Sequence, residues 1–248
     1  MEIISSRAIV LKLLDYRESD RLVTLFTLEH GRLSGIARGS RRSVKRFGGA
    51  LELFAVLNVQ IKLRNALSEL TEADIVTIHS GIRGDLDRIA HAAYATELIA
   101  SLTPEAMPNP RLFRLISAYL DHLDRNPATS SDRRFFEINL LNILGYRPSL
   151  DSCSRCGTVL RGGDGIPGRM VGTDLLCRLC GATGRAISPE TLDLLAGSLA
   201  TGCFGILQFL PAPLAEAGAL LDSIIESHLD APLRSLVFLR EMGKLPGQ

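Results

Sequence analysis

The chain has 248 residues, 46% of them hydrophobic, so it is long enough to bury a core and to form two or three modules. No apolar run approaches the roughly 18 residues that span a bilayer, and the first residues lack the pattern of a signal peptide. A soluble cytoplasmic protein is therefore expected. The net charge of +1 does not by itself indicate a nucleic-acid partner, so such an inference depends on where the charges lie.

The N-terminal part, residues 1–80, is predicted to be a β-domain. Strand-forming runs occur at residues 7–16, 21–30, 32–38, 52–64 and 67–79, and a polar corner separates the first two. No helical pattern long enough to interrupt them is present. Five such strands favour a small closed barrel of the OB type, and an SH3-like barrel is the alternative.

A basic, glycine-rich arm lies within this barrel sequence. No acidic residue occurs between Glu29 and Glu52, whereas basic residues are frequent there. Clustered like charges repel one another, and a polyanion would relieve that repulsion. The candidate DNA-binding residues are Arg32, Arg38, Arg41, Arg42, Lys45 and Arg46, with Phe47 as a platform on which a base could stack. The alternative is a solvated loop that is basic because charge discourages aggregation of strand edges.

From residue 81 the pattern becomes helical. Helices are predicted over residues 85–101, 111–125, 131–144, 189–199, 213–228 and 231–242. Asp85 and Ser188 are expected to cap helix N-termini, Ser131 or Asp132 to start the third helix, and Gly145 to end it in a left-handed conformation. Glu137 and Asn139 lie in an apolar stretch and are interpreted as hydrogen-bonded structural groups. The helical domain is predicted in two parts, residues 81–150 and 185–248.

Two CxxC motifs separate these helical parts, in a segment predicted to span residues 151–184. Each two-residue spacer lets a tight turn direct two thiolates at one ion, and two such turns complete a tetrahedron. Cys153, Cys156, Cys177 and Cys180 are therefore predicted to hold one structural zinc ion. The alternatives are two disulfides or a redox-active CxxC. The fifth cysteine, Cys203, is expected to be a small buried hydrophobic residue.

Signatures of enzymes are absent from the sequence. Residues 163–168 formally match GxGxxG, but they lie between the cysteine pairs and have Pro167 where a helix should begin. No GxxxxGK[ST], GxSxG or HExxH motif occurs, and the five histidines show no ligand spacing. We therefore predict no catalytic residues and no enzymatic activity.

Four blocks of sequence, in this order and at these distances, resemble the bacterial recombination mediator RecO family. They are Arg7-Ala-Ile-Val-Leu-Lys, Gly31-Arg-Leu-Ser-Gly-Ile-Ala-Arg38-Gly, Leu144-Gly-Tyr-Arg-Pro-Ser-Leu-Asp-Ser-Cys153-Ser-Arg-Cys156-Gly and Leu233-Arg-Ser-Leu-Val-Phe-Leu. The resemblance covers essentially the whole chain. It implies an α+β multidomain protein with an N-terminal OB-fold β-barrel, followed by an all-α helical domain that carries an inserted zinc-binding segment with four cysteine ligands.

The resemblance also implies a function in DNA repair. Proteins of this family bind single- and double-stranded DNA, anneal complementary strands without ATP and, with RecR, load RecA onto DNA coated by single-strand-binding protein, whose acidic C-terminal tail they contact. By their place in the motif, Arg32 and Arg38 match the family's DNA-contacting positions. The remaining basic candidates, Arg41, Arg42, Lys45 and Arg46, are inferred from charge alone. The protein is expected in the cytoplasm, associated with the nucleoid. One departure is an insertion at residues 162–165 between the cysteine pairs.

Two other functions are compatible with the residues alone. An OB barrel with a zinc ribbon is equally typical of RNA-binding or ribosome-associated proteins. A protein-interaction adaptor, whose basic arm holds an acidic peptide, is the second alternative.

Overall fold

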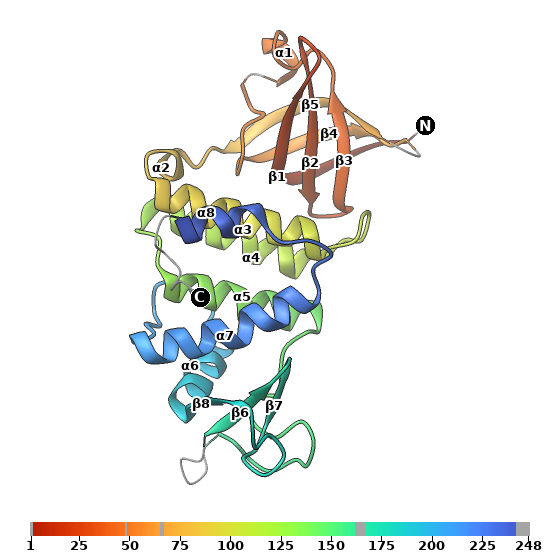
Figure 1. The fold of residues 1–248 in the computed structure, drawn as a ribbon. Helices are drawn as coiled ribbons and strands as arrows, with labels where there is room; N and C mark the ends of the chain where they lie inside the picture. The colour runs from red at the N-terminus through yellow and green to blue at the C-terminus, as the bar shows by residue number, and fades with distance from the viewer. Residues whose placement is uncertain (1, 48, 65–66, 162–166, 242–248) are drawn as a thin grey trace. The chain divides into compact units, whose positions relative to one another are not determined.

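The structure, a computed structural model, describes residues 2–47, 49–64, 67–161 and 167–241, and only the backbone of Val44, Lys45 and Arg240. Two compact units are present (Figure 1): Met1–Pro127 with Leu233–Phe238, and Ala128–Pro232 with Leu239–Gln248. The predicted boundary at residue 80 lies inside the first unit, and the division into four domains stays a prediction. None of the helices in the described ranges combines the length and apolar content that a membrane crossing needs.

Five strands close the predicted barrel. They are β1 (Ile3–Tyr16), β2 (Asp20–Thr27), β3 (Gly31–Ala37), β4 (Val56–Lys62) and β5 (Ser68–Thr77), in the order β1-β2-β3-β5-β4. The long strand β1 pairs with both β2 and β4, which closes the ring. β3 and β5 run parallel and, among the residues that the structure describes, pair only at Gly35–Ser68 and Ile36–Glu69. This five-stranded barrel is the OB fold that the sequence predicted.

The barrel core receives residues from the arm as well as from the strands. Val10, Leu25 and Leu57 face inward from three strands and are almost completely buried. A short helix that the sequence did not predict, α1 (Val44–Phe47), carries Phe47 into the same core. Figure 1 shows α1 at the end of the barrel far from α3 and α4. The arm is therefore anchored at its C-terminal end by apolar burial.

Three helices complete most of the first unit: α2 (Ser80–Arg83), α3 (Leu86–Leu102) and α4 (Pro110–Arg125). Asp85 caps α3 as predicted, because its carboxylate accepts the backbone N–H groups of the first turn. Helix α8 (Arg234–Glu241) begins in this unit, where Glu97 accepts hydrogen bonds from the backbone of Arg234 and Ser235.

The second unit contains α5 (Ser130–Leu144), α6 (Pro189–Ala200) and α7 (Pro211–Ser227), which pack against one another. Thr129, rather than Ser131 or Asp132, caps α5, whereas Gly145 ends it with φ of 84°, as predicted. The expected structural role of Glu137 is confirmed, because it is fully buried and its carboxylate lies 2.6 Å from Arg134. Asn139 likewise donates to two backbone carbonyls.

The cysteine segment folds around a small sheet that the sequence did not predict. Strands β6 (Gly168–Val171), β7 (Asp174–Leu176) and β8 (Arg185–Ile187) pair in the order β7-β6-β8. The GxGxxG match and the insertion lie largely at residues 162–166, outside the described residues. The prediction for Cys203 was wrong: this side chain is exposed, because it lies in the turn that follows α6 and not in the packed face of a helix.

Candidate nucleic-acid interface and metal site

A hollow of about 490 Å³ crosses one outer face of the barrel, and we call it the cleft. Strand register explains its composition. Tyr16 pairs with Asp20, Leu22 with Ile36, and Ile36 with Glu69, and directly opposed residues project from the same face of a sheet. The cleft is lined by Tyr16, Arg17, Asp20, Leu22, Ile36, Arg38, Arg64, Leu67 and Glu69.

Three guanidinium groups give the cleft its positive charge. Arg17 lies over the ring of Tyr16, 5.1 Å from the ring centroid, and occupies a left-handed backbone conformation in the turn between β1 and β2. Arg64 donates to the Glu69 carboxylate at 2.8 Å. Within the described ranges, no carboxylate lies at ion-pair distance from Arg17 or Arg38. The side chains of both can therefore contact an anionic ligand without first breaking an ion pair.

Tyr16 supplies the aromatic surface of this cleft. Its side chain is 39% exposed, whereas Phe26, Phe47 and Phe54 are buried in the first unit. A ring held at the mouth of a basic groove is the arrangement on which single-stranded bases stack. The OB fold binds oligonucleotides on the face of its second and third strands, between the loops that precede the second and the fifth strand. The cleft occupies that position.

The arm, residues 38–49, folds back onto the turn between β1 and β2. The Arg41 amide donates to the Ser19 carbonyl at 3.1 Å, and the Arg42 guanidinium lies 3.3 Å from the Glu18 carboxylate. Both arginine side chains are exposed, and exposed ion pairs contribute only about 0–1 kcal/mol. Phosphate groups could therefore compete with a carboxylate such as that of Glu18 for these guanidinium groups.

The cleft and the arm lie on opposite faces of the β1–β2 hairpin. Tyr16 and Asp20 line the cleft, whereas the neighbouring pair, Asp15 and Arg21, lines a second hollow together with residues 40–43 of the arm. Consecutive side chains in a strand point to opposite faces, so the two hollows are separated by one hairpin. Arg46 links the two regions, because its guanidinium donates to the Arg38 carbonyl at 3.0 Å.

The predicted role of Phe47 as a stacking platform was wrong. The ring is 1% exposed and belongs to the barrel core, so no base can reach it. The physical reason is that α1 brings an apolar side chain to the end of the barrel, where burial is more favourable than exposure. Arg46 covers this ring from outside, 5.3 Å from its centroid. The side chain of Lys45 lies outside the described part of the chain.

Arg32 lies at the opposite end of β3 from Arg38 and does not reach the cleft. Its guanidinium donates to the Thr103 carbonyl at 2.9 Å and lies 3.5 Å from the Glu105 carboxylate. The backbone of Arg32 also accepts a hydrogen bond from Ala106. Arg32 therefore joins β3 to the α3–α4 loop, and its contact with DNA stays a prediction.

Sequence reasoning missed Arg17 and Arg64 as site residues. Arg17 was part of a polar corner, and Arg64 closed a predicted strand, so neither belonged to the basic arm. The signal that could have found them was the OB topology itself, which places the turn after the first strand and the loop after the fourth beside the binding face.

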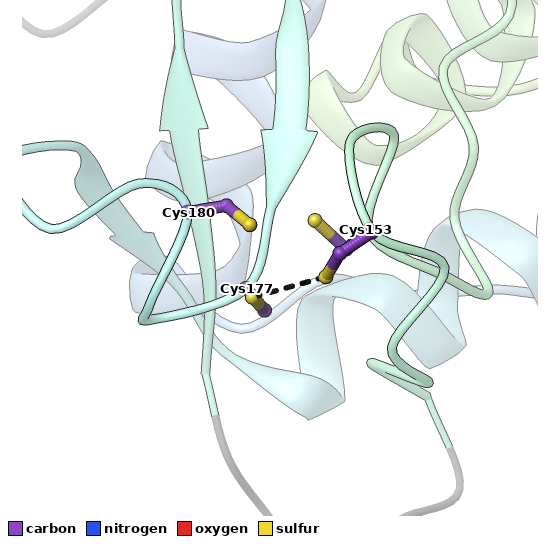
Figure 2. A group of neighbouring side chains, drawn as sticks. Cys153, Cys177 and Cys180 are labelled. Atoms are coloured by element: carbon purple, nitrogen blue, oxygen red, sulfur yellow. Dashed lines mark hydrogen bonds between the residues drawn. The ribbon is translucent and has the colours of Figure 1, made fainter.

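The four predicted cysteines meet at one point, and their sulfur atoms all lie within 4.8 Å of one another. Figure 2 shows the sulfurs of Cys153, Cys177 and Cys180 directed toward a common centre. Both CxxC turns close in the same way: the amide of the following glycine, Gly157 or Gly181, donates at 2.9 Å to the carbonyl of the first cysteine. This repeated turn explains why each pair presents its two sulfurs together.

The surroundings of these thiols differ. Burial opposes ionisation of Cys153, but backbone hydrogen bonds from Cys177, Cys156 and Arg155 outweigh it and lower its pKa to about 6. Contacts with the sulfurs of Cys156 and Cys177 raise the pKa of Cys180 to about 12. Four thiolates this close repel one another unless a cation lies between them.

The cluster fits a tetrahedral metal ion. Sulfur ligands at about 2.3 Å from zinc are separated from one another by about 3.8 Å. The Cys156 and Cys177 sulfurs are 3.6 Å apart, and the whole set lies within 4.8 Å, so small adjustments would complete the tetrahedron. Because all four ligands would come from the protein, no position is left for a substrate, and the ion would be structural.

Comparisons with known proteins agree with these features. A model described as "Recombination protein O N terminal" matches residues 1–79, and one described as "Recombination protein O C terminal" matches residues 83–236. "DNA repair protein RecO" of Geobacter sulfurreducens is 53% identical over 98% of this chain and 99% of its own length. The proteins of the same name from Geobacter metallireducens and Pelobacter propionicus are 50% and 49% identical, and the alignments cover 98% and 95% of this chain and 99% and 96% of theirs. The chain belongs to the RecO family of DNA repair proteins.

Proposed function

We propose that this protein binds single-stranded DNA in the cleft of its OB barrel. The observation that carries the proposal is the cleft itself, where Arg17, Arg38 and Arg64 surround an exposed aromatic ring, that of Tyr16. Guanidinium groups neutralise phosphates and release counterions, while the ring accepts a base of any sequence. The binding should therefore depend strongly on salt and weakly on sequence.

The arm offers a second cationic surface. Arg41, Arg42 and Arg46 lie near the same hairpin as the cleft but are separated from it by the β1–β2 turn. Two basic surfaces on one hairpin could hold two strands, or the two sides of a duplex, close enough for complementary bases to pair. We infer that annealing proceeds by this charge neutralisation, without nucleotide hydrolysis and without catalytic residues.

The proposed partners are those that the family resemblance implies. We propose that the protein acts with RecR and with the acidic C-terminal tail of single-strand-binding protein, and thereby helps to load RecA in the cytoplasm, at the nucleoid. The ion held by Cys153, Cys156, Cys177 and Cys180 is proposed to be zinc, because four thiolates in a tetrahedral set favour it. When bound, it supplies a crosslink between the two CxxC turns and no reaction chemistry.

The cleft can be tested by replacing two of its arginines, R17Q/R38Q, and measuring affinity for single-stranded DNA as a function of salt. Each lost phosphate contact should lower the log-log slope by about 0.7, so we expect a decrease of about 1.4. Affinity should fall by about tenfold for each arginine, because a charged hydrogen bond contributes about 1.5 kcal/mol or more.

The matched control is R7Q/R111Q. Both residues are exposed and lie outside the cleft, and Arg7 lines a hollow that also contains Glu29, Glu72 and Asp74. This variant loses the same charge but should keep the slope. Equal losses in the two variants would show that net charge, and not the cleft, determines binding.

A further inference from the structure

Two carboxylates line the cleft. That of Asp20 accepts a hydrogen bond from the Gly39 amide at 2.8 Å, whereas that of Glu69 lies beside guanidinium groups. Glu69 pairs in register with Ile36 of β3 and with Lys62 of β4, so it projects into the cleft beside Arg38 and Arg64. Its Oε2 accepts a hydrogen bond from Arg64 at 2.8 Å. That hydrogen bond and the nearby positive charges of Arg38 and Lys62 hold the pKa of Glu69 below its ordinary value, so the group is anionic at neutral pH.

The barrel gains little from this ion pair. Both side chains are partly exposed, 39% for Arg64 and 23% for Glu69, and pairs of this kind contribute about 0–1 kcal/mol. Within the described part of the chain, the Glu69 carboxylate accepts a hydrogen bond from Arg64 alone. Its position has a larger effect on ligands, because a carboxylate bound to a guanidinium occupies the place of a phosphate oxygen.

We propose that Glu69 is a built-in competitor for the DNA phosphate in the cleft. It holds Arg64 in the absence of DNA, and a bound strand must displace it or leave that contact unmade. Glu69 thereby sets an upper limit on affinity and speeds release of the strand. The inference rests on the proposed function, because it takes the cleft to be the single-strand site.

The experiment compares E69Q with E72Q. Both remove one negative charge from β5, but Glu72 is exposed outside the cleft and has no basic group within ion-pair distance among the described residues. Glutamine keeps the size of the Glu69 side chain and can still accept from Arg64, so the fold should persist. Single-stranded DNA binding is measured over a range of salt concentrations, together with the dissociation rate.

We expect E69Q to bind about five- to twentyfold more tightly, mainly through slower dissociation. Its salt slope should increase by about 0.7, because Arg64 gains a phosphate contact. E72Q should change affinity by no more than about twofold and leave the slope unchanged. In an R64Q background, E69Q should no longer increase the slope.

Equal effects of E69Q and E72Q would overturn the proposal, since the change would then come from the loss of one negative charge and not from the position of Glu69 in the cleft. Weaker binding by E69Q would also overturn it, and thermal unfolding would show whether the fold had changed. Failure of the proposed function has a different signature, in which R17Q/R38Q binds like its control. The two ideas therefore fail in distinguishable ways.

Discussion

Tyr16 and Phe47 are both aromatic residues of the barrel domain, but they differ in what their rings contact. Tyr16 is exposed in the cleft under Arg17, whereas Phe47 is enclosed in the barrel core. Stacking contributes about 1–3 kcal/mol per base, so Y16A should weaken single-stranded DNA binding by about five- to a hundredfold without changing thermal stability. Y16F keeps the ring and should bind normally. Normal binding by Y16A would exclude the ring from the interface.

Phe47 should show the reverse pattern. Removal of a buried aromatic ring costs about 3–5 kcal/mol, so F47A should lower the free energy of unfolding by that amount. At temperatures at which F47A is folded, the variant should bind single-stranded DNA as tightly as the wild type. Urea denaturation and binding at low temperature separate the two effects. Loss of DNA binding by a fully folded F47A would indicate that the Phe47 ring does contribute to the interface.

Residue-level prediction from the sequence was limited by contacts between distant segments. Charge clustering drew attention to Arg38, Arg41 and Arg42, because these residues are near one another in the chain, and all three line hollows of the barrel. Arg64 and Glu69 reach the cleft only through the pairing of β4 and β5 with their neighbours, which one sequence does not reveal. The contacts of Arg32 with Thr103 and Glu105 were missed for the same reason, because these partners lie far from it in the sequence.

At the scale of the element, helix α6 depends on a carboxylate from α7. Glu216 accepts hydrogen bonds at 2.6–2.7 Å from the Ser188 amide and hydroxyl and from the Thr191 hydroxyl, at the N-terminus of α6. Burial opposes ionisation of Glu216, but these bonds and the charge of Arg185 outweigh it and lower its pKa below 4.5. The folded state therefore favours the carboxylate.

This lowered pKa fixes the direction of the pH effect. Stabilisation by Glu216 should be complete above pH 4.5, its ordinary pKa, and should disappear as the pH falls through the lower folded-state value. At pH 7, E216Q should destabilise α6 by about 1–2 kcal/mol, measured by amide exchange. The difference from wild type should shrink at acidic pH. E190Q, in the exposed first turn of α6, is the control. A difference that stays constant with pH would contradict the assignment.

Elements with a strong local pattern were predictable. Runs of strand-forming residues gave the five strands, and capping residues gave the N-terminus of α3 and the C-terminus of α5. The three strands of the cysteine segment span only three or four residues each and carry no periodicity, so they could not be predicted. Helix α1 was missed because four residues of a basic arm show no amphipathic pattern.

At the scale of the whole molecule, the metal site and the barrel belong to different compact units. Structural zinc supplies roughly 10–16 kcal/mol of binding free energy, far more than so short a segment can gain from its own core. Removal of the ion by a chelator should therefore increase amide exchange in residues 151–187. Exchange in residues 3–77 and affinity for single-stranded DNA should stay unchanged.

Hydrogen exchange with mass spectrometry, on the intact chain, checks this prediction. C156S should lose the metal, whereas C203S should retain it, because Cys203 lies outside the cluster. An equal increase of exchange in the barrel would show that the ion stabilises both units. The meeting of the four cysteines was predictable from the sequence, since CxxC spacing encodes its own geometry, but the division of the chain into two compact units was not.

The short pairing of β3 with β5 leaves residues 31–34 of β3 without a partner from the described residues of β5. The α3–α4 loop covers this strand instead, through a backbone bridge between Arg32 and Glu105 and a hydrogen bond from Ala106. An uncovered strand recruits strands from other molecules. The α3–α4 loop therefore keeps this part of β3 from pairing with a strand of a second copy of the protein.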